Sequence, residues 1–165
     1  MLNWIKRLTA VSAVAVLAAC GGGSEDRNIV QTAQADPRFS TLVEAVAAAD
    51  LVPTLSGPGP FTVFAPTNDA FAALLAELGV TKEQLLANPA LLTQVLTYHV
   101  VPGQVLSSQV PVGVPITTVQ GDTFTVNSNL VITDQRARTA RIVQTDVAAT
   151  NGVIHAIDRV ILPSP

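Results

Sequence analysis

The chain has 165 residues, a formal net charge of −3 and a single cysteine; 48% of its residues are hydrophobic and 13% are charged. This apolar, charge-poor composition is typical of a compact domain and argues against a disordered stalk. A single cysteine excludes an internal disulfide framework and a zinc site built from several cysteines. Beyond Arg136, Arg138 and Arg141 there is no basic cluster, so we expect no nucleic acid partner.

The N-terminal residues have the pattern of a bacterial lipoprotein signal. Lys6 and Arg7 form a positive n-region, and residues 8–19 form an apolar core too short to span a bilayer comfortably. Small residues lie directly before Cys20 in the sequence LAAC, which resembles a lipobox. The resemblance implies cleavage before Cys20 and diacylation of its thiol. The alternative is an uncleaved anchor that happens to contain a cysteine.

This pattern divides the chain into three parts. The signal peptide covers residues 1–19, and the lipidated cysteine with a flexible Gly/Ser/charged tether covers residues 20–27. One domain covers residues 28–165. The mature form carries a net charge of −5, because the two basic residues of the signal are removed. Stable anchoring takes two acyl chains, so we expect attachment to the cell envelope membrane through Cys20. By resemblance to lipoprotein sorting, Gly21 favours the outer membrane of a Gram-negative organism, facing the periplasm or the exterior.

The first half of the domain is predicted to be mostly helical. Asp36-Pro37 is a typical helix start, and apolar residues at helical spacing continue to about Asp50. A short strand at 61–66 is halted by a proline. Capping side chains then predict three more helices, which begin at Thr67, at Thr81 (with Gln84 at capping-box spacing) and at Asn88. The last of these runs until Pro102-Gly103.

The second half is predicted to be strands. Residues 116–119 and 123–126 form a hairpin turning at Gly121-Asp122, and further strands are expected at 130–133, 140–147 and 153–162. Asn151-Gly152 is a tight-turn pair that would set the register of the last strand. The early strand must join this later sheet. Helices segregated from strands predict an α+β domain with a mostly antiparallel sheet.

Three segments in order resemble the conserved motifs of the fasciclin domain family. They are FTVFAPTNDAF at 61–71, LTYHVVPG at 96–103 and NGVIHAIDRVILP at 151–163. The resemblance covers roughly residues 27 to 165 and implies a wedge-like β-sandwich of two mostly antiparallel sheets with a bundle of short helices. Family members are associated with cell adhesion and matrix contact. In some of them the region around the Tyr-His motif binds the partner, which marks Leu92, Val95, Leu96, Tyr98 and His99.

The spacing within this motif also has a structural interpretation. His99 lies one helical turn past Val95 and Leu96, so its ring is expected to point inward, with Tyr98 to one side. Carbonyls left unpaired at the helix end would accept a hydrogen bond from the imidazole. We therefore predict that His99 clamps the helix end to the following strand; a functional histidine is the alternative.

No catalytic or metal constellation is predicted. His155 lies on a strand with apolar residues on both faces, typical of a central, sandwiched strand. Two histidines without cysteine partners make a zinc site improbable, even if folding brings His99 and His155 together. Ser56 is not in a nucleophile elbow, and the carboxylates are scattered over caps and turns. We expect neither an enzyme nor a cofactor.

The sequence thus predicts a lipid-anchored interaction module of the cell envelope that adheres to an unknown surface or matrix partner, either protein or polysaccharide. The alternative is a carrier of an apolar small molecule such as a carotenoid, which some family members bind. Arg136, Arg138 and Arg141 are expected to protect a sheet edge by their charge. Contact with anionic surface polymers or lipid headgroups is the alternative for these arginines.

Overall fold

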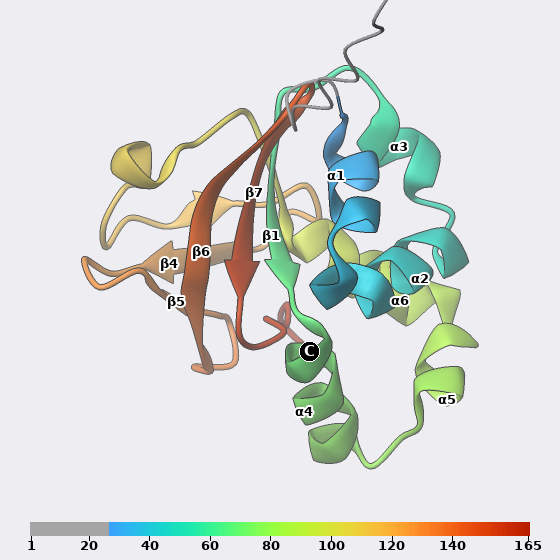
Figure 1. The fold of residues 1–165 in the computed structure, drawn as a ribbon. Coiled ribbons are helices and arrows are strands. Elements are labelled where there is room, and N and C mark those ends of the chain that lie inside the picture. The colour runs from blue at the N-terminus through green and yellow to red at the C-terminus, as the bar shows by residue number, and fades with distance from the viewer. Residues whose placement is uncertain (1–26) are drawn as a thin grey trace, which may run out of the picture.

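A computed structural model describes residues 27–165, in which short helices pack on one side of a curved sheet (Figure 1). The helical elements are α1 (Ile29–Ala35), η2 (Pro37–Phe39), α2 (Ser40–Ala48), α3 (Val52–Ser56), α4 (Asn68–Leu78), α5 (Lys82–Leu86), α6 (Pro89–Tyr98) and η3 (Ser107–Gln109). The strands are β1 (Phe61–Pro66), β2 (Val100–Pro102), β3 (Ile116–Thr117), β4 (Thr123–Val126), β5 (Val131–Thr133), β6 (Thr139–Ala149) and β7 (Gly152–Ile157). The predicted α+β class is confirmed. The predicted signal peptide, Cys20 and nearly all of the tether lie outside the described residues.

The seven strands follow one continuous order, β2-β1-β7-β6-β5-β4-β3. The early strand β1 joins the later sheet as expected, through a parallel pairing with β7, and every other pair is antiparallel. The two layers of the expected sandwich are therefore the two ends of one sheet. Strand β6 connects them, because its residues 139–141 pair with β5 and its residues 142–149 pair with β7 across two register shifts. Figure 1 shows β4 and β5 running across the direction of β6 and β7.

The two edges of this sheet meet and give it a barrel-like shape. The backbone N–H of Val119, in the turn between β3 and β4, donates to the carbonyl of Val100 in β2 at 2.8 Å. Gln120 makes a similar bond to the carbonyl of Thr97 at 3.3 Å. Because the edge strands are short and the β3–β4 turn binds β2 and the end of α6, little open edge remains for another chain to pair with.

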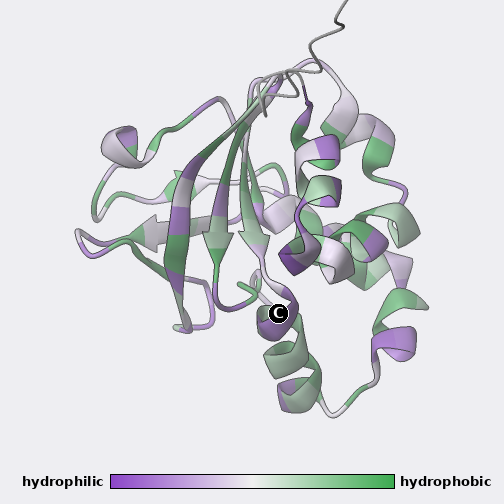
Figure 2. Ribbon diagram, viewed as in Figure 1, coloured by the Kyte–Doolittle hydropathy of each residue, from purple (hydrophilic) through white to green (hydrophobic). Residues whose placement is uncertain are grey.

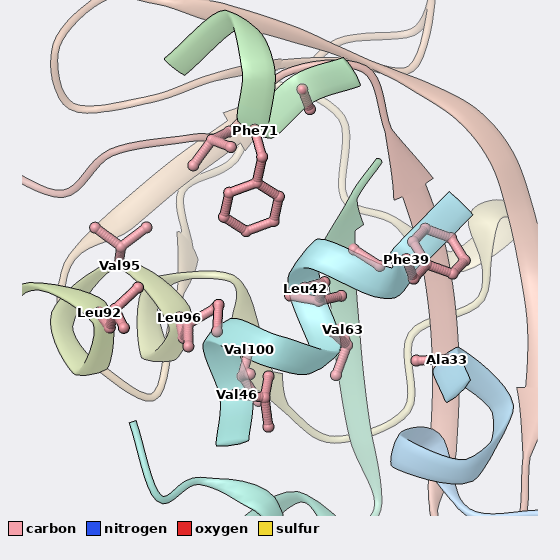
Figure 3. Packing of buried hydrophobic residues seen from close by; sticks show 14 of the residues in the cluster. Ala33, Phe39, Leu42, Val46, Val63, Phe71, Leu92, Val95, Leu96 and Val100 are labelled. Atoms are coloured by element: carbon pink, nitrogen blue, oxygen red, sulfur yellow. The ribbon is translucent and has the colours of Figure 1, made fainter. Parts of the chain in front are cut away.

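The central strands separate two hydrophobic cores. Side chains alternate along a strand, so Val63 and Ala65 of β1 pack against the helices, whereas Phe64 points into the interior of the curved sheet. Figure 2 shows β1 and β7 as largely hydrophobic along their length. In the helix-side core, Phe71 from α4 faces side chains from α2 and α6 (Figure 3). This arrangement agrees with the prediction that the strand carrying His155 is sandwiched.

Local capping places the helix starts where the sequence predicts them. The Thr67 side chain accepts from Ala70 N, Asn88 accepts from Leu91 N, and Thr81 forms a capping box with Gln84. The helix expected from Asp36 is divided, because Asp36 caps the short η2 and α2 then begins at Ser40. The helices α1, α3 and η3 were not predicted. The motif helix ends at Tyr98, four residues before the predicted break, and its continuation pairs as β2.

The last strand is shorter than predicted. It was expected to reach Leu162, but β7 ends at Ile157 and the chain bends at Asp158-Arg159. We call residues 158–165 the C-terminal strap. Its residues Val160 and Leu162 are buried in the helix-side core, and Ile161 is buried in the inner core. The amide of Asp158 still bonds to the carbonyl of Arg141 in β6. Beyond it, side chains from other elements bind the amides of Ile161, Leu162 and Ser164, so these amides do not extend the β7 ladder.

Candidate functional site

His99 joins the end of α6 to the C-terminal strap and is 1% exposed. Its Nδ1 lies 2.6 Å from the carbonyl of Val95, and its Nε2 accepts the backbone N–H of Ile161 at 3.2 Å. The amide of Ile161 can only donate, so the proton of the neutral ring is on Nδ1 and points at Val95. Burial lowers the pKa of His99 to about 4, which keeps the ring neutral near pH 7. The predicted clamp is present, but it holds the strap and not the strand that directly follows the helix.

Tyr98 belongs to the inner core and is completely buried. Its hydroxyl donates to the carbonyl of Thr123 at 2.9 Å, and its ring meets Phe124 edge to face at 6.0 Å between centroids. Burial raises the pKa of the Tyr98 phenol, so the hydroxyl stays protonated. Adjacent residues of the Tyr-His motif thus tie α6 to two different partners, the β3–β4 hairpin and the strap.

The other residues marked by the family resemblance are also in the core. Leu92, Val95 and Leu96 are each at most 5% exposed and point from α6 toward Phe71 (Figure 3). In the folded domain, none of the five marked side chains lies at the surface. A substitution at any of them therefore acts on packing before it can act on a partner.

Two carboxylates that the sequence did not single out hold the strap. Asp134 is buried, and its Oδ2 accepts the backbone N–H of Leu162 at 3.0 Å while its Oδ1 accepts two amides of its own turn, those of Arg136 and Arg138. Asp122 accepts the N–H and the hydroxyl of Ser164, at 2.9 and 2.6 Å. These hydrogen bonds from Ser164 lower the pKa of Asp122. The strap is thus fixed by hydrogen bonds from three separate elements.

A serine, an aspartate and a histidine do meet near β6 and β7, but not in a catalytic order. Ser107 donates both its N–H and its hydroxyl to the carboxylate of Asp146, which lowers the pKa of that carboxyl. His155 is completely buried; its Nδ1 accepts the backbone N–H of Asp146 at 3.2 Å, and its Nε2 lies 2.9 Å from the carbonyl of Val105. A nucleophilic serine needs a base that accepts its proton. Here both imidazole nitrogens are bound to backbone, so the network holds the loop over β7.

The Asn151-Gly152 turn does more than set a strand register. The Asn151 side chain accepts Ile29 N at 2.9 Å and donates to the carbonyls of Leu55 and Gly57, so it connects β7 to α1 and α3. Gly152 has a φ of 157°, and a Cβ placed there would lie 1.9 Å from the carbonyl oxygen of Phe61. Only glycine lets β1 approach β7 this closely.

The two apolar hollows are small. One of about 30 Å³ lies between α1, α2 and the sheet, and the other, of about 150 Å³, lies between α4, α6 and the end of the strap. Small-molecule pockets usually measure about 300–1,000 Å³. Within residues 27–165 we find no cluster of three or more His, Cys, Asp or Glu that could hold a metal. None of the helices in the same range has the length and apolarity to cross a membrane.

The sequence profile of the Fasciclin domain matches residues 37–163. This chain belongs to the fasciclin domain family. It is 51% identical to Protein sll1483 of Synechocystis sp. over 138 residues, which is 82% of this chain and 73% of that protein. It is also 39% identical to the pig transforming growth factor-beta-induced protein ig-h3 over 136 residues, 82% of this chain but 19% of that longer protein.

A solved structure shares the fold. The FAS1 domain pair of the insect cell adhesion molecule Fasciclin I superposes with a TM-score of 0.74 at 17% identity, over 84% of this chain and 51% of that one. The fasciclin resemblance seen in the three sequence motifs is thereby confirmed. Each of the three motifs contributes a side chain that joins distant parts of the fold. Asn68 binds the carbonyl of Pro37 and the amide of Thr41. His99 binds the strap, and Asn151 binds α1 and α3.

Proposed function

We propose that this protein is a cell-envelope interaction module, anchored through a lipidated Cys20, that attaches the cell to a surface or matrix partner without catalysis. The observation that carries this proposal is the fasciclin fold, which the chain shares with a cell adhesion molecule. The lipobox resemblance at LAAC supports the anchor. An extracellular or cell-envelope location fits both.

The arrangement of polar side chains supports a role in binding rather than chemistry. Both histidines of the chain are buried and have both ring nitrogens occupied by backbone groups. Ser107 donates its hydroxyl to the carboxylate of Asp146 and not to a histidine. The hydrogen bonds from Ser107 lower the pKa of that carboxyl, which makes it a weak base.

For the five residues of the Tyr-His region, we propose an indirect role. Leu92, Val95, Leu96, Tyr98 and His99 would support a partner surface by fixing α6, the hairpin and the strap relative to one another. Because they are buried, loss of adhesion in their variants should follow loss of folding. A His99→Ala variant that melts like wild type but no longer binds would contradict this role.

The carrier alternative gains no support from the described residues. The apolar hollow enclosed between the helices and the sheet measures about 30 Å³, and the groove beside α6 about 150 Å³. Both are below the usual size of a ligand pocket, and a carotenoid is a long molecule that needs more. Protein purified from its native host should therefore show no visible absorption band. An extractable pigment would revive the carrier function.

The anchor is tested by Cys20→Ser, with Ser24→Ala in the predicted tether as the matched control. Membrane fractions should lose the Cys20→Ser protein and keep the control, and palmitate labelling should disappear only from the former. Adhesion is tested by the retention of cells that carry or lack the protein on surfaces coated with envelope or matrix extract. Equal retention of the two strains would overturn the proposed function.

A further inference from the structure

A polar hollow of about 480 Å³ lies where the start of β6, the end of β7 and α4 meet. Its lining consists of Ala73, Val131, Thr139, Arg141, Asp158 and Arg159. It is open and shallow, unlike the two apolar hollows. Its walls combine two guanidinium groups, one hydroxyl and one carboxylate with two small apolar side chains, which is a composition suited to a charged, hydroxyl-bearing ligand.

The charge at this hollow is opposite to that of the whole protein. Arg138 and Arg159 both bind the carboxylate of Glu77, the second at 3.2 Å, so one acid serves two arginines. Arg141 is exposed and has no acidic partner among residues 27–165. The Oδ1 of Asp158 is occupied by the backbone N–H of Arg141, at 2.7 Å. In and beside the hollow, Arg138, Arg141 and Arg159 outnumber the exposed carboxylates of Glu77 and Asp158 and leave a local excess of positive charge. The mature chain, by contrast, has a net charge of −5.

The hollow lies at the end of the domain opposite Arg27. The carbonyl of Arg27 accepts the N–H of Thr150 at 2.8 Å, next to the start of β7. Strand β7 then runs six residues away from this point before it reaches Asp158, a length of about 20 Å at roughly 3.3 Å per residue. Figure 1 shows the start of α1 and the end of β7 at opposite ends of the sheet. If Cys20 anchors the chain in a membrane, the hollow lies at the end of the domain farthest from the point where the tether joins it.

We propose that this hollow binds the carboxylate groups of an acidic, uronic-acid-containing polysaccharide. The planar guanidinium fork of Arg141, which has no acidic partner among the described residues, would bind a carboxylate through two hydrogen bonds. Arg159, which already binds Glu77 at 3.2 Å, would add a further charge-assisted contact. The Thr139 hydroxyl and the free oxygen of Asp158 would bind sugar hydroxyls, and Ala73 and Val131 would contact the C–H face of a ring. The position away from the anchor favours a polymer in the surroundings over the lipid headgroups of the protein's own membrane. This assignment rests on the proposed function, because it names the chemistry of the surface partner.

The test measures binding of polygalacturonate to the intact chain, purified in a nonionic detergent, with neutral dextran as the uncharged comparison. Wild type should bind polygalacturonate, increasingly weakly as salt is added, because salt screens exposed charges. The double variant Arg141→Gln/Arg159→Gln should bind at least roughly tenfold more weakly, as expected for the loss of two charge-assisted contacts. The matched control Arg38→Gln/Lys82→Gln removes the same charge from other faces and should stay within about twofold of wild type.

A gain-of-binding variant separates recognition from misfolding. Asp158→Asn removes a negative charge from the hollow but keeps an oxygen for the amide of Arg141, so it should bind polygalacturonate more tightly than wild type. Unchanged binding in the double arginine variant, or equal binding to dextran, would overturn the proposal. Equally tight, arginine-dependent binding to phosphatidylglycerol vesicles would assign the hollow to lipid instead. If the protein does not bind polygalacturonate but cells that carry it still adhere, only the proposed hollow is refuted. If the protein binds polygalacturonate but cells that carry it adhere no better than cells that lack it, only the adhesive role is refuted.

Discussion

Acidification tests the role of His99 most directly. In the folded domain its Nε2 accepts the amide of Ile161, and a second proton on the ring would place two donors against each other in a buried site. Burial lowers the pKa of His99 from 6.5 to about 4. The folded protein therefore resists a proton that the unfolded chain accepts readily.

The sign and size of the effect follow from linkage. Between pH 6.5 and pH 4 the unfolded state binds more protons at this site than the folded state does, so the free energy of unfolding falls as the pH falls. The contribution is complete above about pH 6.5 and is lost by about pH 4. A shift of this size corresponds to roughly 3 kcal/mol, at about 1.4 kcal/mol per pH unit. The lowered pKa values of Asp36, Asp122 and Asp146 lie below 3.8, so these carboxylates lose their contributions at lower pH.

The assay is urea unfolding of wild type and His99→Ala at a series of pH values from 7 to 4. At pH 7 the variant should be less stable by about 4 kcal/mol, because it leaves a cavity and removes the partner of Val95 O and of Ile161 N. Between pH 6.5 and 4 the stability difference between the two proteins should shrink by roughly 3 kcal/mol, because only wild type has the buried imidazole. A difference that stays constant over this range, or grows on acidification, would refute the buried neutral clamp.

Two further substitutions test the close approach of β1 to β7 and the fixing of the strap. Gly152→Ala should destabilise the domain by at least about 3 kcal/mol, because its Cβ would collide with the carbonyl of Phe61; Gly121→Ala, whose Cβ meets open space, should cost only about 1–2 kcal/mol of backbone strain. Equal melting temperatures for these two variants would contradict the collision. Asp134→Ala should cost about 2–4 kcal/mol, because the buried amide of Leu162 loses its acceptor. Hydrogen exchange at Leu162 should then become faster than exchange at the β7 amides, and unchanged protection would show that the carboxylate does not hold the strap.

The parts of this fold that are fixed by contacts between residues close in sequence could be predicted from the sequence. Thr67, Asn88 and the Thr81–Gln84 pair bind amides no more than three residues away, so the helix starts are visible in the sequence itself. The missed helix α1 carries a similar signal, a capping box between Asn28 and Gln31. Its seven residues are too short for apolar spacing to stand out.

The contacts that span long stretches of chain could not be predicted. His99 and Ile161 are 62 residues apart, and no local pattern indicates that the amide beyond β7 meets an imidazole and not another strand. The burial of Tyr98 could not be predicted for a related reason. Prediction from helical spacing assumes that a helix buries one face, whereas α6 packs one face into the helix-side core and Tyr98 into the inner core. Its position beside the apolar stripe was inferred correctly, but its complete burial depends on the hairpin that covers it.

The C-terminal strap has a consequence for biosynthesis. Val160, Ile161 and Leu162 fill gaps in both hydrophobic layers, yet they come at the end of the domain and are translated last. Strand β7, directly before them, is the parallel partner of β1, whose residues are translated some 90 positions earlier. A growing chain therefore cannot reach its final packing until nearly all of the domain has been made.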